Sequence, residues 1–363
     1  MKKIIIIIFW VLVALGFWGW ADGWISFGPK NENIEIKNIQ TLTPTAVPKN
    51  VGYLAQYNFE NLKKRTNTAS EIKTIGQVLL VDEARKALVK RGDLKGKTFN
   101  TFESKAISFE SNGKKISGMM NIPKDPPSQE TTAGKPAIIM IRGFADSEGY
   151  YIGSGSWRAA DELARNGFVT VSLDFLGFGL SDDESKDILE ARFEKPVSVL
   201  DLIESVKKLE FVDAEKIGIW AHSNGGQIAI SVLEVTGKNY PTVLWAPMTN
   251  PFPGSVLDTM DENSESGKIV KNRIDEFEKE YDSKLYSIDN FYDGINAPIL
   301  LHQGTADTSV KLEWQKELQT KLKSLGKEIT LDIRKGNDHN FKQNWDEVMA
   351  QDVAFLKEKF DIL

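Results

Sequence analysis

The sequence predicts an α/β fold in which a mostly parallel sheet carries helices on both faces. Two observations support this class. Short, continuously apolar segments alternate with longer segments whose apolar residues recur at helical spacing, and glycine-rich loops follow several of the apolar segments. Continuous apolar strands are typical of parallel sheets that are buried on both faces. Such sheets bind ligands at the carboxyl ends of their strands, so the residues after each strand are the first candidates for a functional site.

The predicted elements follow one another in a regular order. A hairpin comes first, because two alternating segments flank Asn112 and Gly113, a dipeptide that favours tight turns. Apolar runs predict strands, and 3.6-residue periodicity predicts the helices between them. We expect strands at residues 105–110, 115–122, 137–141, 168–173, 217–220, 242–245, 298–301 and 329–333. We expect helices at about residues 82–91, 157–166, 196–209, 312–325 and 344–360, and one directly after Ser223.

Composition and charge exclude several classes of function. The 363 residues suffice for one large α/β domain with extensions, and 41% of them are hydrophobic, as in ordinary globular proteins. The net charge of −6 and the lack of a basic stripe argue against a nucleic-acid partner. The chain has no cysteine, which excludes disulfides and thiolate metal sites. Composition does not determine the oligomeric state.

The amino terminus predicts a membrane anchor. Lys2 and Lys3 precede eighteen uncharged residues, 4–21, which as a helix span roughly 27 Å, about the thickness of a bilayer core. The lysines predict that this end lies in the cytoplasm and the main domain outside. A signal peptide cleaved after Ala21, which would release a secreted protein, is the alternative. The bulky Trp20 and the lack of an A-x-A site favour the anchor.

The chain therefore divides into four parts. Residues 1–27 form the anchor or signal segment, and the Pro/Thr-rich residues 28–50 form a polar linker without a core of their own. Residues 51–104 carry no recognisable functional motif, and we expect them to pack on the main domain as an accessory layer. The main domain, residues 105–363, holds the alternating strands and helices.

One connection in the main domain is unusually long. Residues 247–294 separate two consecutive strands, which is more than an ordinary link requires. This segment has 11 acidic and five basic side chains. It forms either a solvated surface helix or a cap over the mouth of the active site. An acidic cap would disfavour anionic substrates.

A candidate nucleophile stands at the end of the strand predicted at 217–220. Ser223 follows this strand and is followed at once by a helical pattern, with small residues, Ala221 and Gly225, two positions on either side. A nucleophile elbow needs this strand–turn–helix context, because the strained turn lifts the serine hydroxyl clear of the sheet. A serine that only caps an ordinary helix is the alternative interpretation of this segment.

A serine hydroxyl needs a neighbouring base to remove its proton. The sequence has three histidines. His222 adjoins the nucleophile, where its side chain would point away from the hydroxyl, and we expect His302 to form only local hydrogen bonds. His339 lies in a loop after the last strand, at the edge of the sheet where the elbow ends. Its position makes His339 the candidate base.

The base needs a carboxylate to fix its tautomer. Asp307 lies in a turn-rich loop after the strand at 298–301. The order Ser223, Asp307, His339 is the one found with this kind of elbow. Asp174 also follows a strand and is the competing acid, although we interpret it as structural.

The tetrahedral intermediate of acyl transfer needs donors directed at its oxyanion. The backbone amide of Asn224, at the amino end of the elbow helix, is the first candidate. The second is the amide of Phe144, in the loop after the strand at 137–141, where Gly143 either lets the backbone approach closely or serves only as a turn residue. The hydroxyl of Tyr150 or Tyr151 is an alternative donor.

From residue 105 to its end the chain resembles an α/β-hydrolase of the prolyl-oligopeptidase and dienelactone-hydrolase branch. The resembling motifs lie at residues 111–118, 142–144, 174–182, 222–226, 302–310 and 339–341. The resemblance implies a triad of Ser223, Asp307 and His339, no cofactor or metal, and cleavage of a peptide or a small ester. It thus implies a serine-type peptidase or a carboxylesterase. A catalytically silent binding domain is the alternative from another class.

This sequence departs from the family pattern in three places. Arg142 stands where many relatives carry histidine, and we expect it to pair with a nearby aspartate and not to bind a substrate carboxylate. Ala221 replaces the first glycine of the elbow. No segment before residue 105 is long enough for the β-propeller of prolyl oligopeptidases, which puts size-selective peptide cleavage in doubt.

Overall fold

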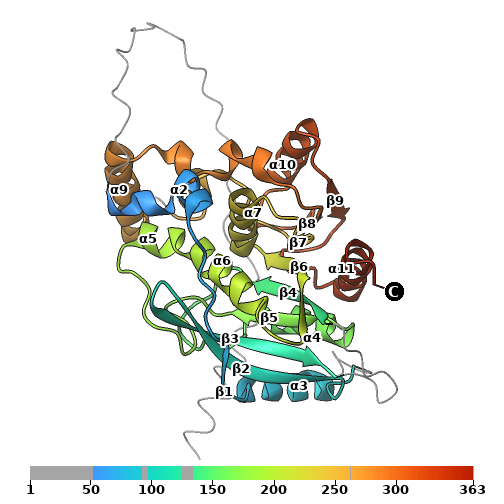
Figure 1. The fold of residues 1–363 in the computed structure, drawn as a ribbon. Helices are drawn as coiled ribbons and strands as arrows, with labels where there is room; N and C mark the ends of the chain where they lie inside the picture. Colours follow the sequence, from blue (N-terminus) through green and yellow to red (C-terminus); the bar gives the residue numbers. More distant parts are fainter. Residues whose placement is uncertain (1–51, 92–96, 125–133, 262, 363) are drawn as a thin grey trace, which may run out of the picture. The chain divides into compact units, whose positions relative to one another are not determined.

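Nine strands form one mixed sheet in the computed structural model (Figure 1). The structure describes residues 52–91, 97–124, 134–261 and 263–362. The strands are β1 (Lys73–Gly76), β2 (Phe102–Ser111), β3 (Lys114–Pro123), β4 (Lys135–Ile141), β5 (Val169–Leu173), β6 (Val212–His222), β7 (Thr242–Trp245), β8 (Ile299–Gly304) and β9 (Ile329–Arg334). Their order in the sheet is β1-β2-β3-β5-β4-β6-β7-β8-β9. The pairs from β1 to β5 along this order are antiparallel, and the remaining pairs are parallel, as predicted.

The predicted hairpin is present and its turn follows from its sequence. Strands β2 and β3 pair along their whole length, ending with Ser111 opposite Lys114. Asn112 and Gly113 have φ values of 49° and 74°. Two successive residues with positive φ are the requirement of a type I′ turn, which explains the Asn-Gly dipeptide.

Helices cover both faces of the sheet. They are α2 (Phe59–Lys64), α3 (Leu79–Arg91), α4 (Trp157–Arg165), α5 (Ile188–Phe193), α6 (Lys195–Val206), α7 (Asn224–Thr236), α8 (Gly254–Leu257), α9 (Glu265–Glu280), α10 (Leu312–Ser324) and α11 (Trp345–Lys359). One apolar core packs α6, α7 and α10 against the sheet, and a second core packs α3, α4 and α11 on the opposite face. The predicted helices are therefore confirmed, whereas the short helix α5 was not predicted.

Residues 52–91 contribute to the sheet and the core of the main domain, which an accessory layer would not do. Strand β1 pairs with β2 at the edge of the sheet, and α3 buries Val81 in the second core. Ahead of them, the 3-10 helix η1 (Tyr53–Tyr57) and α2 reach across to the long connection, where Leu54 donates its amide to the Tyr281 hydroxyl at 3.3 Å. Helix α2 also packs on α7, the elbow helix.

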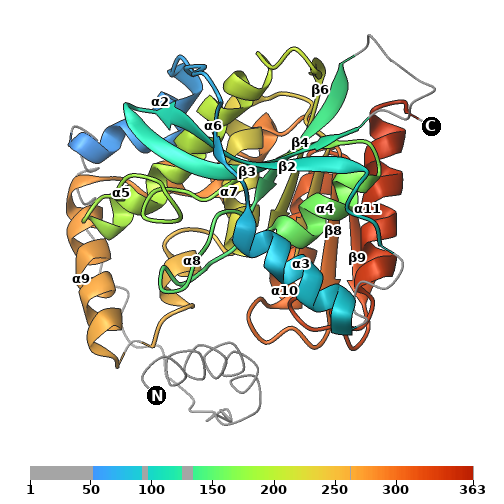
Figure 2. The ribbon, with the colours of Figure 1, turned by 90° about the horizontal axis from the view of Figure 1, so that it is seen from below.

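The long connection forms a helical insertion. Besides α8 and α9 it contains three 3-10 helices, η2 (Ser283–Tyr286), η3 (Ile288–Asn290) and η4 (Tyr292–Gly294). Helix α9 buries Val270, Ile274 and Phe277 in a third apolar cluster shared with η1, α2 and α5, while its opposite face is exposed. Both ribbon views place α9 beside α2 and α5 (Figures 1 and 2). The insertion is therefore a packed layer and not a solvated surface helix.

The predicted membrane anchor (residues 1–27) and the linker (28–50) lie outside the described residues. The described residues belong to a compact unit of residues 47–363. Within the described ranges no helix is both long and apolar enough to span a membrane.

Candidate active site

Ser223 occupies a strained turn between β6 and α7. Its backbone has φ 54° and ψ −124°, a region that a residue with a side chain adopts only where its surroundings impose it. Its amide donates to the Trp245 carbonyl at 2.9 Å, and its carbonyl accepts from the Met248 amide at 2.8 Å. The Ser223 side chain makes no capping hydrogen bond to the helix. The alternative of an ordinary helix cap is therefore wrong, and the geometry is that of a nucleophile elbow.

Small residues make this turn possible. A Cβ atom on Gly225 would lie 2.5 Å from the Arg142 carbonyl oxygen, so helix α7 passes the end of β4 too closely for any side chain. A Cβ atom on Gly143 would lie 2.9 Å from Cβ of Ser223. The loop after β4 thus runs directly against the candidate nucleophile, as the close-approach interpretation of Gly143 predicted.

The structure brings Asp307 and His339 together at the carboxyl edge of the sheet. The Nδ1 atom of His339 lies 2.8 Å from Oδ2 of Asp307. The other carboxylate oxygen accepts the amides of Ser309 and Val310 at 2.8 and 3.0 Å. Burial alone would raise the pKa of Asp307, but these hydrogen bonds and His339 lower it below its ordinary value. An ionised Asp307 requires a proton on Nδ1 of His339 and leaves Nε2 as the acceptor.

Close loop packing fixes this pair. Gly304, at the end of β8, lies so close to Asn337 that a Cβ atom would collide with the Asn337 carbonyl. The Ala306 amide donates to the same carbonyl at 3.0 Å. Behind His339, the buried ring of Phe341 packs on Trp245 with centroids 5.1 Å apart. The loops that carry the acid and the base are therefore joined to each other and to the core.

His222 contributes in a way that the sequence did not reveal. Its Nε2 lies 3.0 Å from the backbone oxygen of His339, and the two rings lie 4.7 Å apart. Burial lowers the pKa of His222 to about 4, so the ring is neutral near pH 7. A neutral ring with its proton on Nε2 donates to that oxygen and tethers the His339 loop. The elbow motif contains His222, but nothing in the sequence indicates its partner.

The second candidate oxyanion donor sits in a loop that Arg142 holds. Phe144 has an 81% exposed side chain, so packing of that side chain does not fix its backbone. Arg142 Nη1 donates to the Gly143 carbonyl at 2.8 Å, and Nη2 donates to the Asp174 carbonyl at 2.7 Å. The Gly143 carbonyl and the Phe144 amide belong to the same peptide group. Arg142 therefore orients the peptide whose N–H is the candidate donor.

The contacts of Asp174 correct one prediction and decide between two alternatives. Arg142 bonds the backbone oxygen of Asp174 and not its carboxylate, which differs from the predicted ion pair. The buried carboxylate accepts from Ser117 at 2.6 Å, from the Gly153 amide at 2.8 Å and from Tyr150 at 3.0 Å. Asp174 is thus structural, as predicted. The Tyr150 hydroxyl is bound to Asp174, which removes it as an alternative oxyanion donor.

His302 has longer-range partners than predicted. Its two ring nitrogens each lie 2.8 Å from a carboxylate, Asp332 on β9 and Asp352 on α11. Burial alone would lower the pKa of His302, but the two carboxylates raise it. Asp352 also accepts the indole N–H groups of Trp220 and Trp245. His302 therefore joins the last helix to the sheet, and the prediction of only local bonds was wrong.

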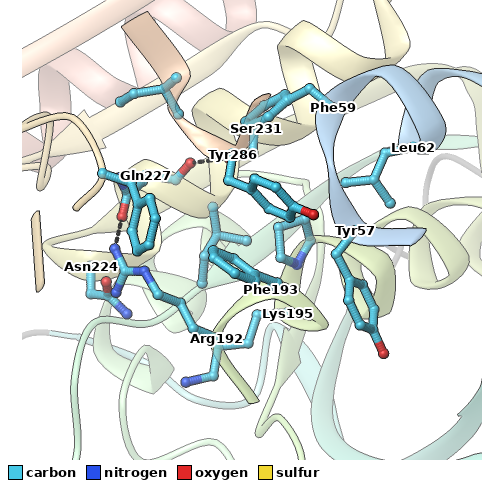
Figure 3. Close-up of a pocket in the computed structure, with 14 residues that line it drawn as sticks. Tyr57, Phe59, Leu62, Arg192, Phe193, Lys195, Asn224, Gln227, Ser231 and Tyr286 are labelled. Atoms are coloured by element: carbon cyan, nitrogen blue, oxygen red, sulfur yellow. Dashed lines mark hydrogen bonds between the residues drawn. The ribbon is translucent and has the colours of Figure 1, made fainter. Parts of the chain in front are cut away.

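A cavity extends from the elbow between α7 and the insertion (Figure 3). Its lining comes from four parts of the chain: Tyr57, Phe59 and Leu62 of the amino-terminal segment; Arg192, Phe193, Lys195 and Pro196 at the junction of α5 and α6; Asn224, Gln227, Ile228 and Ser231 of α7; and Phe252, Tyr286 and Ile288 of the insertion. The insertion therefore walls the cavity, as a cap would. The wall from residues 57–62 was not predicted, because no motif marks it.

The part of the chain that the structure describes contains no cluster of metal-ligating side chains. No group of three or more His, Asp or Glu side chains there is arranged to hold a metal ion.

Several proteins of known structure share this fold. A puromycin-hydrolyzing peptidase of Mycobacterium tuberculosis is 14% identical, with a TM-score of 0.58 over 75% of this chain and 42% of its own. Est1E from Butyrivibrio proteoclasticus is 18% identical, with a TM-score of 0.51 over 70% of this chain and 99% of its own. An acetyl xylan esterase from Paenibacillus sp. R4 is 16% identical, with a TM-score of 0.55 over 81% and 98%. At these identities the likeness shows the fold.

Sequence comparison gives the family. A curated protein of Escherichia coli, described only as uncharacterized, is 30% identical over 91 residues. The match spans 25% of this chain and 30% of that protein. The model of the prolyl oligopeptidase family matches residues 156–362, more than half of the chain, including the elbow and the loops of Asp307 and His339. The chain has an α/β-hydrolase fold and belongs to the prolyl oligopeptidase family.

Proposed function

We propose that this protein is a serine hydrolase that cleaves a peptide or a carboxylic ester through an acyl-enzyme. Ser223 Oγ attacks the substrate carbonyl carbon while Nε2 of His339 accepts its proton. The intermediate collapses when His339 returns this proton to the leaving amine or alcohol. Water then attacks the acyl-enzyme by the same route in reverse and releases the acid. Asp307 holds the Nδ1 proton of His339 throughout.

The observation that carries this proposal is the strained backbone of Ser223. A left-handed serine costs about 1–3 kcal/mol, and a helix cap would not require this cost. Asp307 and His339 form their hydrogen bond at the same edge of the sheet, which is where a strained nucleophilic serine needs its base. The family match and the peptidase and esterase neighbours support the same class of activity.

The proposed oxyanion hole consists of the Asn224 and Phe144 amides. Asn224 is the first residue of α7, so its N–H has no acceptor within the helix. The contact of Gly143 with Ser223 supports the placement of the neighbouring Phe144 amide on the other side of the oxyanion. Donors placed in advance in this way stabilise the charge that develops on the carbonyl oxygen.

A fluorophosphonate probe tests the proposal directly. We expect it to label the wild-type protein and not the Ser223→Ala variant, whose fold is checked by circular dichroism. Hydrolysis of 4-nitrophenyl esters, compared with that of aminoacyl-anilides, then distinguishes an esterase from a peptidase. A folded wild-type protein that is neither labelled nor active on either substrate set would favour the silent binding domain.

We also propose, from the sequence of residues 1–27, that the catalytic domain is held at the outer side of a membrane. Lys2 and Lys3 before the uncharged segment 4–21 support this orientation. Fractionation of cells that express the full chain tests it. Recovery in the membrane fraction after carbonate washing is expected, whereas release of a shortened protein into the medium would indicate a cleaved signal peptide.

A further inference from the structure

The cavity beside the elbow extends away from the catalytic histidine. Its residues on α7 are Asn224, Gln227, Ile228 and Ser231, which lie on one face of the helix that begins at Ser223. None of the lining residues comes from the loops of Asp307 or His339. In the proposed reaction His339 protonates the leaving group, so the leaving group departs on the His339 side. The cavity on the opposite side is then the place for the acyl group.

Arg192 is a cation without an ionic partner in this cavity. Its Nη2 donates to two neutral groups, the Gln227 side-chain oxygen and, at 3.0 Å, the Ser255 hydroxyl. Among the described residues, no carboxylate forms a salt bridge with it, and its Nε and Nη1 groups have no protein acceptor. Burial lowers the pKa of Arg192 to about 10. Figure 3 shows its guanidinium directed at Gln227, on the same side of the cavity as Asn224.

Lys195 adds a second cation to the same wall. It begins helix α6, three residues after Arg192, and forms no salt bridge with the described part of the chain. Burial lowers the pKa of Lys195 to about 8, and the charges of Arg192 and Arg142 lower it further against the opposing effect of Glu184. Two cations thus share one side of a cavity that is otherwise lined mainly by apolar and aromatic residues.

Two other arginines near the cavity do have carboxylate partners. Arg273 of α9 pairs with Asp187 at 2.7 Å, and Arg65 pairs with Asp201 at 2.7 Å. Removing a charge from water without a partner is costly, and proteins accept that cost mainly at sites that bind or react. Arg192 is half-buried and bears part of this cost, which a bound anion would offset.

We propose that the cavity binds the carboxylate of a short acidic acyl group, with Arg192 as its main partner and Lys195 as its second. This inference rests on the proposed hydrolase function and names its substrate class. A guanidinium with two free N–H directions suits a carboxylate, which it binds through parallel hydrogen bonds. The cavity has a volume of about 40 Å³, and because about 10–15 Å³ by this measure already holds one water, it has room for a short acyl chain that ends in a carboxylate.

The acidic insertion does not oppose this substrate. The carboxylates of Asp275, Glu276 and Glu278 lie on the exposed face of α9. The insertion lines the cavity with Phe252, Tyr286 and Ile288, none of which is charged. The preference against anions that the acidic composition predicts is therefore not expected in the cavity itself.

Two esters that differ in one charge test the inference. Mono-4-nitrophenyl succinate carries a carboxylate, and 4-nitrophenyl butyrate is a neutral ester of the same chain length. We expect Arg192→Gln to lower the ratio of kcat/KM for succinate over butyrate at least tenfold. Arg273→Gln is the matched control, because that cation is already neutralised by Asp187, and it should leave the ratio unchanged.

The outcomes separate the two proposals. If the wild-type protein hydrolyses neither ester and is not labelled by the fluorophosphonate probe, the hydrolase function is wrong. Suppose instead that the wild-type protein hydrolyses both esters and that Ser223→Ala abolishes both activities. If folded Arg192→Gln then keeps the wild-type ratio of kcat/KM, the function stands and the carboxylate site is wrong. If Arg192→Gln does not fold, inhibition of wild-type butyrate hydrolysis decides. Succinamate, an anion, should then inhibit at least tenfold more strongly than neutral succinamide, and equal inhibition would overturn the inference.

Discussion

Replacing Arg142 by methionine is expected to lower kcat and to leave KM nearly unchanged. The Arg142 guanidinium donates to two backbone carbonyls, one of which is that of Gly143 at 2.8 Å, in the peptide that carries the Phe144 amide. The side chain is buried, and its guanidinium lies 4.0 Å over the ring of Phe178. Methionine keeps much of the side chain's packing and removes the donors together with the positive charge. The variant therefore tests whether orientation of the peptide matters for the oxyanion.

The size of the effect follows from the bond that is lost. A hydrogen bond with one charged partner contributes about 1.5–3 kcal/mol. Complete loss of one oxyanion donor costs about 10²–10³ in kcat. In the variant the Phe144 amide is still present, but Arg142 no longer holds its orientation. We expect kcat to fall about 10- to 100-fold, because the oxyanion forms only in the transition state and ground-state binding does not depend on it.

The assay is steady-state hydrolysis of 4-nitrophenyl butyrate, with the concentration of active sites set by fluorophosphonate titration. Arg165→Met is the control, because Arg165 pairs with Glu162 at 2.8 Å within α4. Arg142→Lys should recover only part of the rate, since one ammonium does not reach both carbonyls as the forked guanidinium does. A folded Arg142→Met protein whose kcat stays within about threefold of wild type, or whose loss lies wholly in KM, would refute the positioning role.

Two further substitutions test the acid and the core. Asp307→Asn should lower kcat for the same ester about 10³- to 10⁴-fold, since an amide favours the wrong tautomer of His339; a loss below tenfold would argue against Asp307 as the acid. Glu234 on α7 is 1% exposed, neither carboxylate oxygen has a hydrogen-bond partner among the residues that the structure describes, and burial raises its pKa well above 4.5. The folded protein keeps this proton after the unfolded chain releases it, so wild-type stability falls as pH rises above 4.5, by at most about 1.4 kcal/mol per pH unit. In urea unfolding at pH 5 to 8, the stability gain of Glu234→Gln should grow with pH, and a constant difference would contradict this account.

The sequence predicted the parallel part of the sheet because that part depends on local pattern. Each buried strand is a continuous apolar run, and β7 begins and ends where the pattern predicts, at residues 242–245. The candidate triad was predictable for the same reason. Ser223, Asp307 and His339 each follow a strand, and parallel strands bring their carboxyl ends to one edge. The hydrogen bond of His339 with Asp307 needs no information beyond this order.

The cavity was not predictable, because its walls meet only in three dimensions. Tyr57 and Tyr286 line the same space although 229 positions separate them in the sequence. Arg192 lies in a short helix with no motif, and nothing nearby in the sequence indicates that no carboxylate of the described ranges pairs with it. The same limit applies to His302, whose partner Asp352 is 50 residues away. Local patterns report burial and turn type, but they do not report which charged groups meet.

The candidate catalytic residues and the residues proposed to select the substrate come from different parts of the fold. The candidate nucleophile, acid and base lie on loops at the end of parallel strands, where close backbone packing at Gly143, Gly225 and Gly304 leaves little room for change. The cavity is lined by α6 and by the elbow helix α7, but also by residues 57–62, by α5 and by the insertion, and the last three are additions around the sheet. A change in these additions reshapes the acyl site without moving the Ser223 backbone. Because Arg192 belongs to the additions, a preference for acidic acyl groups is expected to vary independently of the hydrolytic machinery.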